Sequence, residues 1–194
     1  MPGNTSTGGM NLFSSVIGAT VSGIDGIPVI VEVDVSGGLP SFEIVGMPDT
    51  SVREARHRVR SAIKNCGFDI PSRKITVNLA PANMHKEGTQ LDLAVAVSLL
   101  NASRQLSGSE RIDEYGFLGE LALNGAVRPV SGVLAMSLAL RDSGRKGVVV
   151  PKGNRGEVSF LSDFDVRLAE SLKDVTAFVE GKKSLAIPSK HVPT

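Results

Sequence analysis

The sequence is poor in residues that cross-link a protein or hold it in a membrane. Its 194 residues include one cysteine, Cys66, which excludes an internal disulfide and a cysteine-based zinc site. No apolar run approaches the roughly 20 residues that a membrane-crossing helix needs. The first residues also lack the basic and apolar regions of a signal peptide. We therefore expect a soluble, cytoplasmic protein that does not bind a membrane.

Aromatic residues and excess charge are scarce as well. Aromatic residues make up 4% of the chain, so we do not expect nucleic-acid bases to stack on a row of aromatic side chains. The formal net charge is +1, from 21 basic and 20 acidic residues, so the field of the whole molecule does not attract nucleic acid. Any such binding must come from local clusters of cations.

The rest of the composition is ordinary for one globular domain, with 41% hydrophobic and 21% charged residues. The first residues are small, polar and rich in glycine, and we interpret residues 1–10 as a flexible leader. We expect one domain over residues 11–181. Residues 182–194 have the composition of a linker that leaves this domain.

The first third of the chain alternates between strand and helix signals. Runs of β-branched residues on both sides of Asp25-Gly26 predict a hairpin over residues 12–36. A short strand over residues 42–45 is expected to extend this meander. Pro48 then ends the strands, and Asp49 or Thr50 can cap a helix that continues to Asn65. Its apolar residues recur at helical spacing and predict a core face: Val52, Ala55, Val59, Ala62 and Ile63.

The remainder of the chain mixes strands and helices. We predict a buried strand over residues 74–79, then a helix over residues 91–102 that is apolar on nearly every side and forms the spine of the core. Further elements are a hairpin around Asn124-Gly125 over residues 115–130, a helix over 132–140, a strand over 147–150 and a helix over 168–179. Because the strands and helices do not alternate regularly, the pattern favours an α+β fold.

Several kinds of chemical site can be rejected from the sequence. The nearest match to a phosphate-binding loop, at Gly181-Lys182, lacks the first glycine and the final hydroxyl of GxxxxGK[ST]. The histidines His57, His85 and His191 show no paired metal-ligand spacing. Asp92, three residues after Thr89, is interpreted as part of a variant capping box. We expect no cofactor or metal on this chain.

A set of motifs spreads along most of the chain. The segment Lys86-Glu87-Gly88, followed by Asp92, Leu93 and Ala96, fits the pattern KEGxxxDLxxA. Other motifs are Gly38-Leu39-Pro40 with Val45-Gly46, Asn78 to Pro81, Gly119-Glu120-Leu121 and Arg128-Pro129-Val130. Together they resemble the amino-terminal domain of the ComM/YifB family of magnesium-chelatase-like AAA+ ATPases. The resemblance covers residues 12–180 and implies the fold of the Lon protease catalytic domain.

The resemblance also implies where a Lon-type serine–lysine dyad would lie. The serine position holds Gln90, and the lysine position, counted from Ser131-Gly132, holds Leu134. A carboxamide does not form an acyl-enzyme and leucine cannot accept a proton, so we expect no catalytic residue and no peptidase activity. The alternative is a relocated dyad that pairs Ser98 or Ser131 with Lys86.

Family members continue into an AAA+ motor with Walker motifs, which binds ATP and magnesium and assembles into a hexamer. This chain stops before such a motor, so we expect its partners to be that motor and the neighbouring subunits. The family's role in DNA uptake and recombination further implies DNA as a partner of the full-length protein. What this chain contributes must be argued from its own charges.

The predicted helix over residues 49–65 carries a stripe of cations. Arg53, His57, Arg60 and Lys64 are spaced to share one face, and Arg56 lies beside it. Glu54 is placed to neutralise Arg58 four residues on. We predict phosphate contacts without base readout from five residues: Arg53, Arg56, Arg60, Lys64 and Lys86. Two alternatives remain: a solvated helix face, or a ring-stacking interaction module that does not touch DNA.

Overall fold

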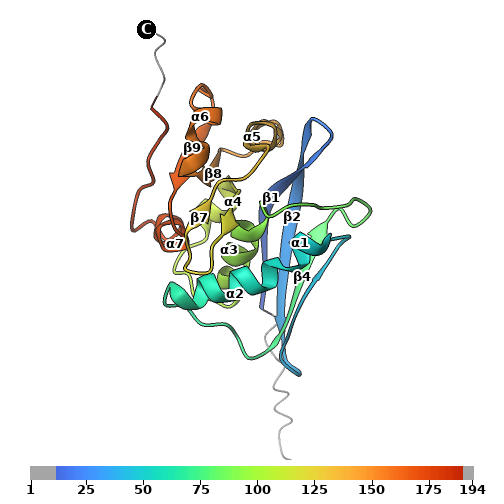
Figure 1. The fold of residues 1–194 in the computed structure, drawn as a ribbon. Coiled ribbons are helices and arrows are strands. Elements are labelled where there is room, and N and C mark those ends of the chain that lie inside the picture. The colour runs from blue at the N-terminus through green and yellow to red at the C-terminus, as the bar shows by residue number, and fades with distance from the viewer. Residues whose placement is uncertain (1–11, 190–194) are drawn as a thin grey trace, which may run out of the picture.

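Residues 12–189 are described by a computed structural model, and they form an α+β fold around one seven-stranded sheet (Figure 1). The predicted fold class is confirmed. The predicted leader, and residues 190–194 of the predicted linker, lie outside the described residues. The strands are β1 (Leu12–Ser22), β2 (Asp25–Ser36), β3 (Ser41–Val45), β4 (Lys74–Ala80), β5 (Tyr115–Phe117), β8 (Gly147–Pro151) and β9 (Asp165–Ala169).

The sheet has the order β3-β4-β2-β1-β5-β8-β9 and divides into two halves. In the first half β1 pairs with β2, and β2 with β4, in antiparallel register, while β3 pairs in parallel with β4 at the edge. In the second half β5, β8 and β9 all run parallel, and β5 joins the halves by pairing with β1. We call these the antiparallel half and the parallel half.

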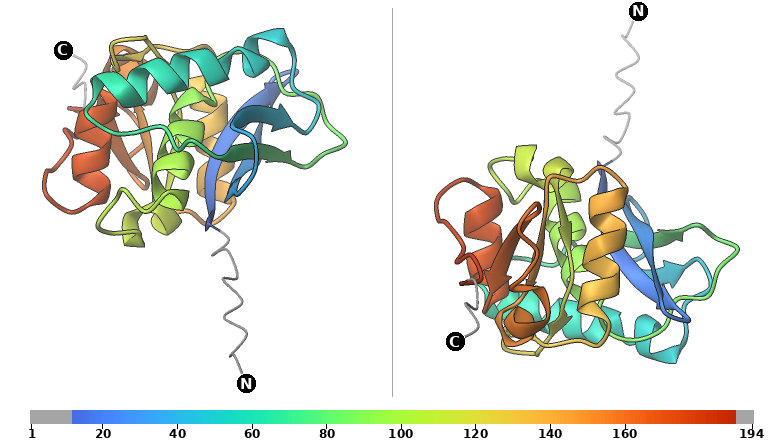
Figure 2. Two further views of the ribbon diagram at one scale, coloured as in Figure 1. Left: turned by 90° about the horizontal axis from the view of Figure 1, so that it is seen from below. Right: turned by 90° about the horizontal axis from the view of Figure 1, so that it is seen from above.

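Helices cover both faces of the sheet (Figure 2). One face carries α2 (Ala55–Asn65), α3 (Asp92–Ala102) and α7 (Leu172–Val179), and the other carries α5 (Val133–Asp142) and α6 (Arg155–Val158). Helix α3 is buried at every position except Asn101, which confirms that it is the spine of the core. The remaining elements are α1 (Thr50–Arg53), α4 (Glu110–Glu114), the single-turn η1 (Lys152–Asn154), and a short hairpin of β6 (Glu120–Leu121) and β7 (Val127–Arg128).

The first hairpin turns two residues earlier than predicted. Gly23 and Ile24 form the turn, with Gly23 at a φ of 64°, whereas Asp25 and Gly26 already pair with β1. Gly26 serves a different purpose from a turn residue: a Cβ there would lie 2.2 Å from the carbonyl oxygen of Ala135 in α5. The Asp-Gly pair therefore marks a close approach between β2 and α5.

Two other predictions are wrong in instructive ways. Strand β3 does not extend the meander, because β4 lies between β3 and β2 and pairs with both. The last helix does not begin at Leu168, which belongs to β9; it begins at Leu172, after Ser171 caps it by accepting a hydrogen bond from the Asp174 amide. Strand β9 exists because β8 offers a parallel partner, which local sequence patterns do not reveal.

Candidate nucleic-acid interface

Helices α1 and α2 hold the predicted cation stripe on the surface. Asp49, one of the two predicted caps, caps the first turn by accepting a hydrogen bond of 2.8 Å from the Val52 amide. The helical run is interrupted at Glu54, then continues to Asn65. The predicted core face is confirmed, since Val52, Ala55, Val59, Ala62 and Ile63 are all buried. The opposite side of the same helices is therefore fixed towards solvent.

Four of the five predicted phosphate-binding residues share this exposed side. Arg53, Arg56, Arg60 and Lys64 are exposed, and none of them forms an ion pair within residues 12–189. The Arg60 guanidinium lies 5.9 Å from the centroid of the Phe42 ring in β3, which orients one of the cations. We call these four residues the basic face.

Lys86, the fifth predicted residue, does not belong to the basic face. Its side chain is fully buried, and its ammonium donates hydrogen bonds to the carbonyl of Gly46, at 2.7 Å, and to that of Pro81. Burial lowers the pKa of Lys86. Its backbone pairs with Met47 and Asp49, at 3.1 and 3.0 Å. The prediction that Lys86 touches phosphate is corrected, because its ammonium instead fixes the loop that leads into α1.

Arg58 has a different partner from the predicted Glu54. Its Nε and Nη2 donate to the Asp92 carboxylate at 2.6 and 3.0 Å, and Nη2 also donates to the Ser51 carbonyl. Asp92 is 1% exposed and accepts a third hydrogen bond from the Leu121 amide. Burial raises the pKa of Asp92, and the bonds from Arg58 and Leu121 oppose that rise. The pair ties α2 to α3 and β6.

This ion pair overturns the predicted capping box of Thr89 and Asp92. The Asp92 carboxylate is committed to Arg58 and Leu121, and the Thr89 hydroxyl instead donates to Glu120 at 2.6 Å. An acid three residues after a threonine fits both roles equally well in sequence. Only the position of Arg58, 34 residues earlier, distinguishes them.

The two dyad positions lie in packed structure. Gln90 is buried, and its amide nitrogen donates to the Glu87 carbonyl at 2.5 Å and to the Thr20 hydroxyl at 3.2 Å. Leu134 is half-buried in α5. The glutamine side chain therefore braces the Lys-Glu-Gly loop against β1.

Neither serine of the alternative dyad forms a hydrogen bond to a basic side chain within the described residues. The Ser98 hydroxyl is buried and donates to the Val31 carbonyl at 3.2 Å, while Ser131 is exposed in a turn before α5. The ammonium of Lys86, their proposed base, is occupied by the two loop carbonyls. Neither serine is hydrogen-bonded to Lys86 in the described structure.

The region around Gly181 is held by ion pairs rather than shaped as a phosphate loop. Lys182 pairs with Glu180 at 3.1 Å, and Lys183 pairs with Asp174 at 2.6 Å. The first residues of the predicted linker then pack back on the domain, since Leu185 is buried and the Leu168 amide donates to the Ala186 carbonyl at 2.8 Å. The linker boundary itself stays a prediction.

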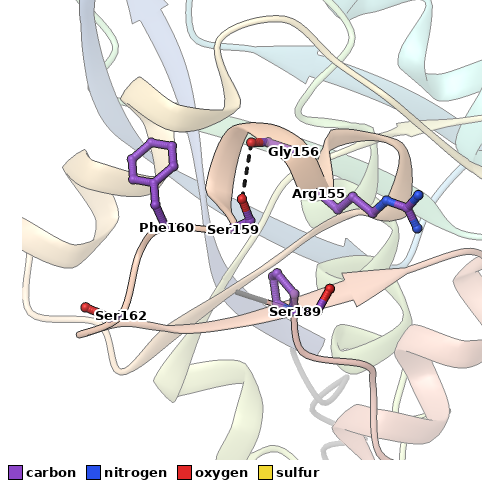
Figure 3. A pocket seen from close by; sticks show the side chains of 7 residues that line it. Arg155, Gly156, Ser159, Phe160, Ser162 and Ser189 are labelled. Carbon is purple, nitrogen blue, oxygen red and sulfur yellow. Dashed lines mark hydrogen bonds between the residues drawn. The ribbon is translucent and has the colours of Figure 1, made fainter. Parts of the chain in front are cut away.

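Sequence reasoning missed a groove of about 890 Å³ beside α6 (Figure 3). It is lined by Arg155, Gly156, Ser159, Phe160, Ser162, Pro188 and Ser189. It shares no residue with the basic face and contains no carboxylate or histidine that would supply acid–base chemistry. Within residues 12–189 no three His, Cys, Asp or Glu side chains are placed to hold a metal ion. Across the same span no helix is long and apolar enough to cross a membrane.

Comparisons with known proteins identify relatives over most of the chain. The family described as subunit ChlI of Mg-chelatase matches residues 31–154. The uncharacterized protein YifB of Escherichia coli is 47% identical over 166 residues, which cover 86% of this chain and 32% of YifB. The competence protein ComM of Haemophilus influenzae is 41% identical over 170 residues, which cover 88% of this chain and 33% of ComM.

A more distant similarity bears on the fold. The Lon protease of Mycolicibacterium smegmatis is 25% identical over 171 residues, which cover 82% of this chain and 22% of the protease. This similarity confirms the predicted Lon-like fold. The chain spans about one third of the length of the YifB and ComM relatives that it matches.

Proposed function

This chain belongs to the family described as subunit ChlI of Mg-chelatase and is similar to YifB and ComM, and we propose that it is the Lon-like domain of a ring-forming AAA+ ATPase that processes DNA. In this proposal the domain has no peptidase activity, contributes to oligomerisation, and contacts the DNA backbone through the basic face. The name of ComM, a competence protein, supports DNA uptake as the setting.

The basic face is the observation that carries the DNA contact. Its four cations are exposed, are free of ion pairs within the described structure, and follow one side of two consecutive helices. At about 1.5 Å per helical residue they extend over about 16 Å, enough to follow several phosphates of one strand. The exposed aromatic side chains, Phe13 and Phe160, lie on other elements, so the proposed contact is electrostatic and does not read bases.

Loss of peptidase activity is supported by Gln90 and Leu134. Neither side chain can act as nucleophile or base, and Gln90 is engaged in bracing a loop. Incubation with unfolded casein and with a serine-reactive fluorophosphonate probe tests this part. We expect neither cleavage nor labelling. Labelling of one serine would contradict it and would revive the relocated dyad.

Fluorescence polarisation of a labelled duplex across a salt series tests the DNA contact. Each neutralised phosphate contributes about 0.9 to the slope of log affinity against log salt, so three or four contacts predict a slope near −3. Reversing two charges, with Arg53→Glu and Arg60→Glu together, is expected to abolish binding without unfolding the chain, since both side chains are exposed. The dissociation constant of the wild-type chain should be on the order of micromolar to 100 micromolar at physiological salt.

The matched control must reverse two charges away from the basic face. Arg167 is unsuitable, because it pairs with Asp165 at 2.8 Å and lies 5.7 Å from the Phe178 ring. Arg155→Glu with Lys173→Glu is the better control, as both residues are exposed and lie on α6 and α7. This control should keep more than half of the affinity. Equal losses in the control and in the Arg53/Arg60 variant would favour an interaction module without DNA contact.

A further inference from the structure

Within the described residues, one face of the sheet has no covering helix over β4, β3 and the part of β2 that lies beyond α5. Directly paired residues on neighbouring strands point to the same face of a sheet. Ile17 packs with the α5 side of the molecule, and its partner Ile30 in β2 must point the same way. Helix α5 packs on β1 and β2 near the Gly26 end, while β4 and β3 extend beyond it (Figure 2). The outer surface of β2, β4 and β3 is therefore open.

This open surface is acidic. Asp34, Thr76 and Glu43 form one row across β2, β4 and β3, and Glu32, Asn78 and Val45 form the next. The three carboxylates form no ion pair within residues 12–189, and their one side-chain bond is from Asn78 to Glu32 at 3.0 Å. We call Glu32, Asp34 and Glu43 the acidic face.

Apolar side chains are exposed within the same surface. Ile30 and Val45 are 43% and 42% exposed, and both point outward with the carboxylates. Lys74 lies on the next row, between Ser36 and Ser41, and is the one cation on this surface of β2, β4 and β3 within residues 12–189. Exposed apolar groups among unpaired charges are typical of a surface that another molecule covers.

The acidic and basic faces lie on opposite sides of the molecule. Helix α2 packs on α3, on the side of the sheet that faces away from α5, and the basic face is the outward side of α1 and α2. Despite the net charge of only +1, the molecule therefore carries two separated surfaces of opposite sign. A small net charge leaves little long-range repulsion between copies.

We infer that the acidic face binds the basic face of a second copy of this chain. Because the two faces differ, the contact is head-to-tail and leaves both outer faces free for further copies, as in a ring or an open chain. The carboxylates occupy the place that DNA phosphates take in the proposed function, so DNA competes with the neighbouring copy. That competition rests on the proposed function, whereas the association does not.

Sedimentation velocity of the described chain at low and high salt gives the first test. At about 50 mM salt, where the screening length exceeds 10 Å, the wild-type chain should sediment as a concentration-dependent mixture of monomer and larger species. At about 500 mM salt it should be monomeric. A chain that stays monomeric at low salt up to about 100 micromolar would overturn the inference.

Charge reversal gives the sharper test. The acidic-face variant Asp34→Lys/Glu43→Lys and the basic-face variant Arg53→Glu/Arg60→Glu should each associate at least about tenfold more weakly than wild type. A mixture of the two variants should associate again, since each then offers a face complementary to the other. The control Glu110→Lys/Asp142→Lys, with both residues exposed on α4 and α5, should behave as wild type. Circular dichroism confirms that each variant is folded.

Failure of the mixture to associate, or equal weakening in the control, would overturn the inference. Measurements of DNA binding distinguish a failure of this inference from a failure of the proposed function. The acidic-face variant should bind the labelled duplex at least as tightly as wild type, and added duplex should dissolve wild-type assemblies. If the chain binds no DNA yet the mixture rescues association, the proposed DNA contact fails and the self-association stands. If the chain binds DNA and no association occurs, the proposed DNA contact stands and the self-association fails.

Discussion

The two halves of the sheet are both rich in valine, but they differ in how many of their strand residues are buried. Strand β8 in the parallel half is buried at all five positions, from Gly147 to Pro151, because helices cover both of its faces. Strand β2 in the antiparallel half buries Val29, Val31, Val33 and Val35 and leaves the alternate residues accessible. The parallel half is therefore buried on both faces, while the antiparallel half buries one face in the core and presents charge on the other.

This difference in burial predicts the largest contrast in unfolding free energy between a polar substitution in β8 and an apolar substitution in β2. Val149→Asp in β8 places an unpaired carboxylate in the core and should cost more than about 4 kcal/mol, enough to abolish cooperative folding. Glu32→Val on the open face of β2 should change stability by less than about 0.5 kcal/mol. Urea unfolding followed by circular dichroism measures both. A folded Val149→Asp variant would show that β8 is not buried on both faces.

A second contrast lies within α2. Arg58→Met leaves the Asp92 carboxylate buried without its partner and should cost about 3–5 kcal/mol. The double variant Arg58→Met/Asp92→Leu should be less destabilised than this single variant, because no unpaired charge remains. Arg56→Met, exposed on the same helix, should cost less than about 0.5 kcal/mol. Equal costs at positions 56 and 58 in urea unfolding would contradict the assigned roles.

These pairs show what sequence patterns capture and what they miss. Local rules narrowed the cap to Asp49 or Thr50 and located the buried face of α2 and the burial of α3, because each depends on residues within a few turns of one helix. The four residues of the basic face were also correctly placed on the surface. Charge identity alone did not show that Lys86 is buried, because its partners are carbonyls of distant residues.

The same limit applies to the strands. The edge position of β3 depends on β4, which lies about thirty residues later in the chain, and β9 depends on β8. Hydrophobic periodicity indicates which residues of a strand face the core, but it does not indicate which other strand pairs with it. Alternation in β2 places Glu32 and Asp34 on one face, but only the register of β2, β4 and β3 brings Glu43 beside them.

A third prediction concerns the solvent exposure of Tyr115 in the parallel half. Burial and a hydrogen bond to Asp165 raise the pKa of Tyr115 to about 12. Burial alone would raise the pKa of Asp165, but hydrogen bonds from Tyr115 and Arg167 lower it. Tyr115 is the single tyrosine and tryptophan is absent, so phenolate absorbance reports this site alone.

The titration should have its midpoint near pH 12 in the folded chain and near pH 10 after denaturation. Because the folded pKa is the higher one, this stabilisation is complete below pH 10 and is lost between pH 10 and about 12. Asp165→Asn should lower the folded midpoint. A native midpoint at pH 10 would show that Tyr115 is open to solvent.

The last prediction is a small change in stability on substitution of Ser137 in α5. Its hydroxyl is buried and has no hydrogen-bond partner within the described residues. Ser137→Ala removes this unsatisfied group and should leave stability unchanged or raise it by up to about 1 kcal/mol. Thermal unfolding measures the change. A loss of more than about 1 kcal/mol would mean that the hydroxyl makes a bond in solution.

The central claim is that the basic face of α1 and α2 binds phosphate while the acidic face does not. The most direct measurement is the salt dependence of duplex binding by the wild-type chain, the Arg53→Glu/Arg60→Glu variant and the Asp34→Lys/Glu43→Lys variant, compared side by side. We predict a slope near −3 for wild type, no measurable binding for the basic-face variant, and unchanged or tighter binding for the acidic-face variant. Binding by the basic-face variant with the wild-type slope would contradict the account.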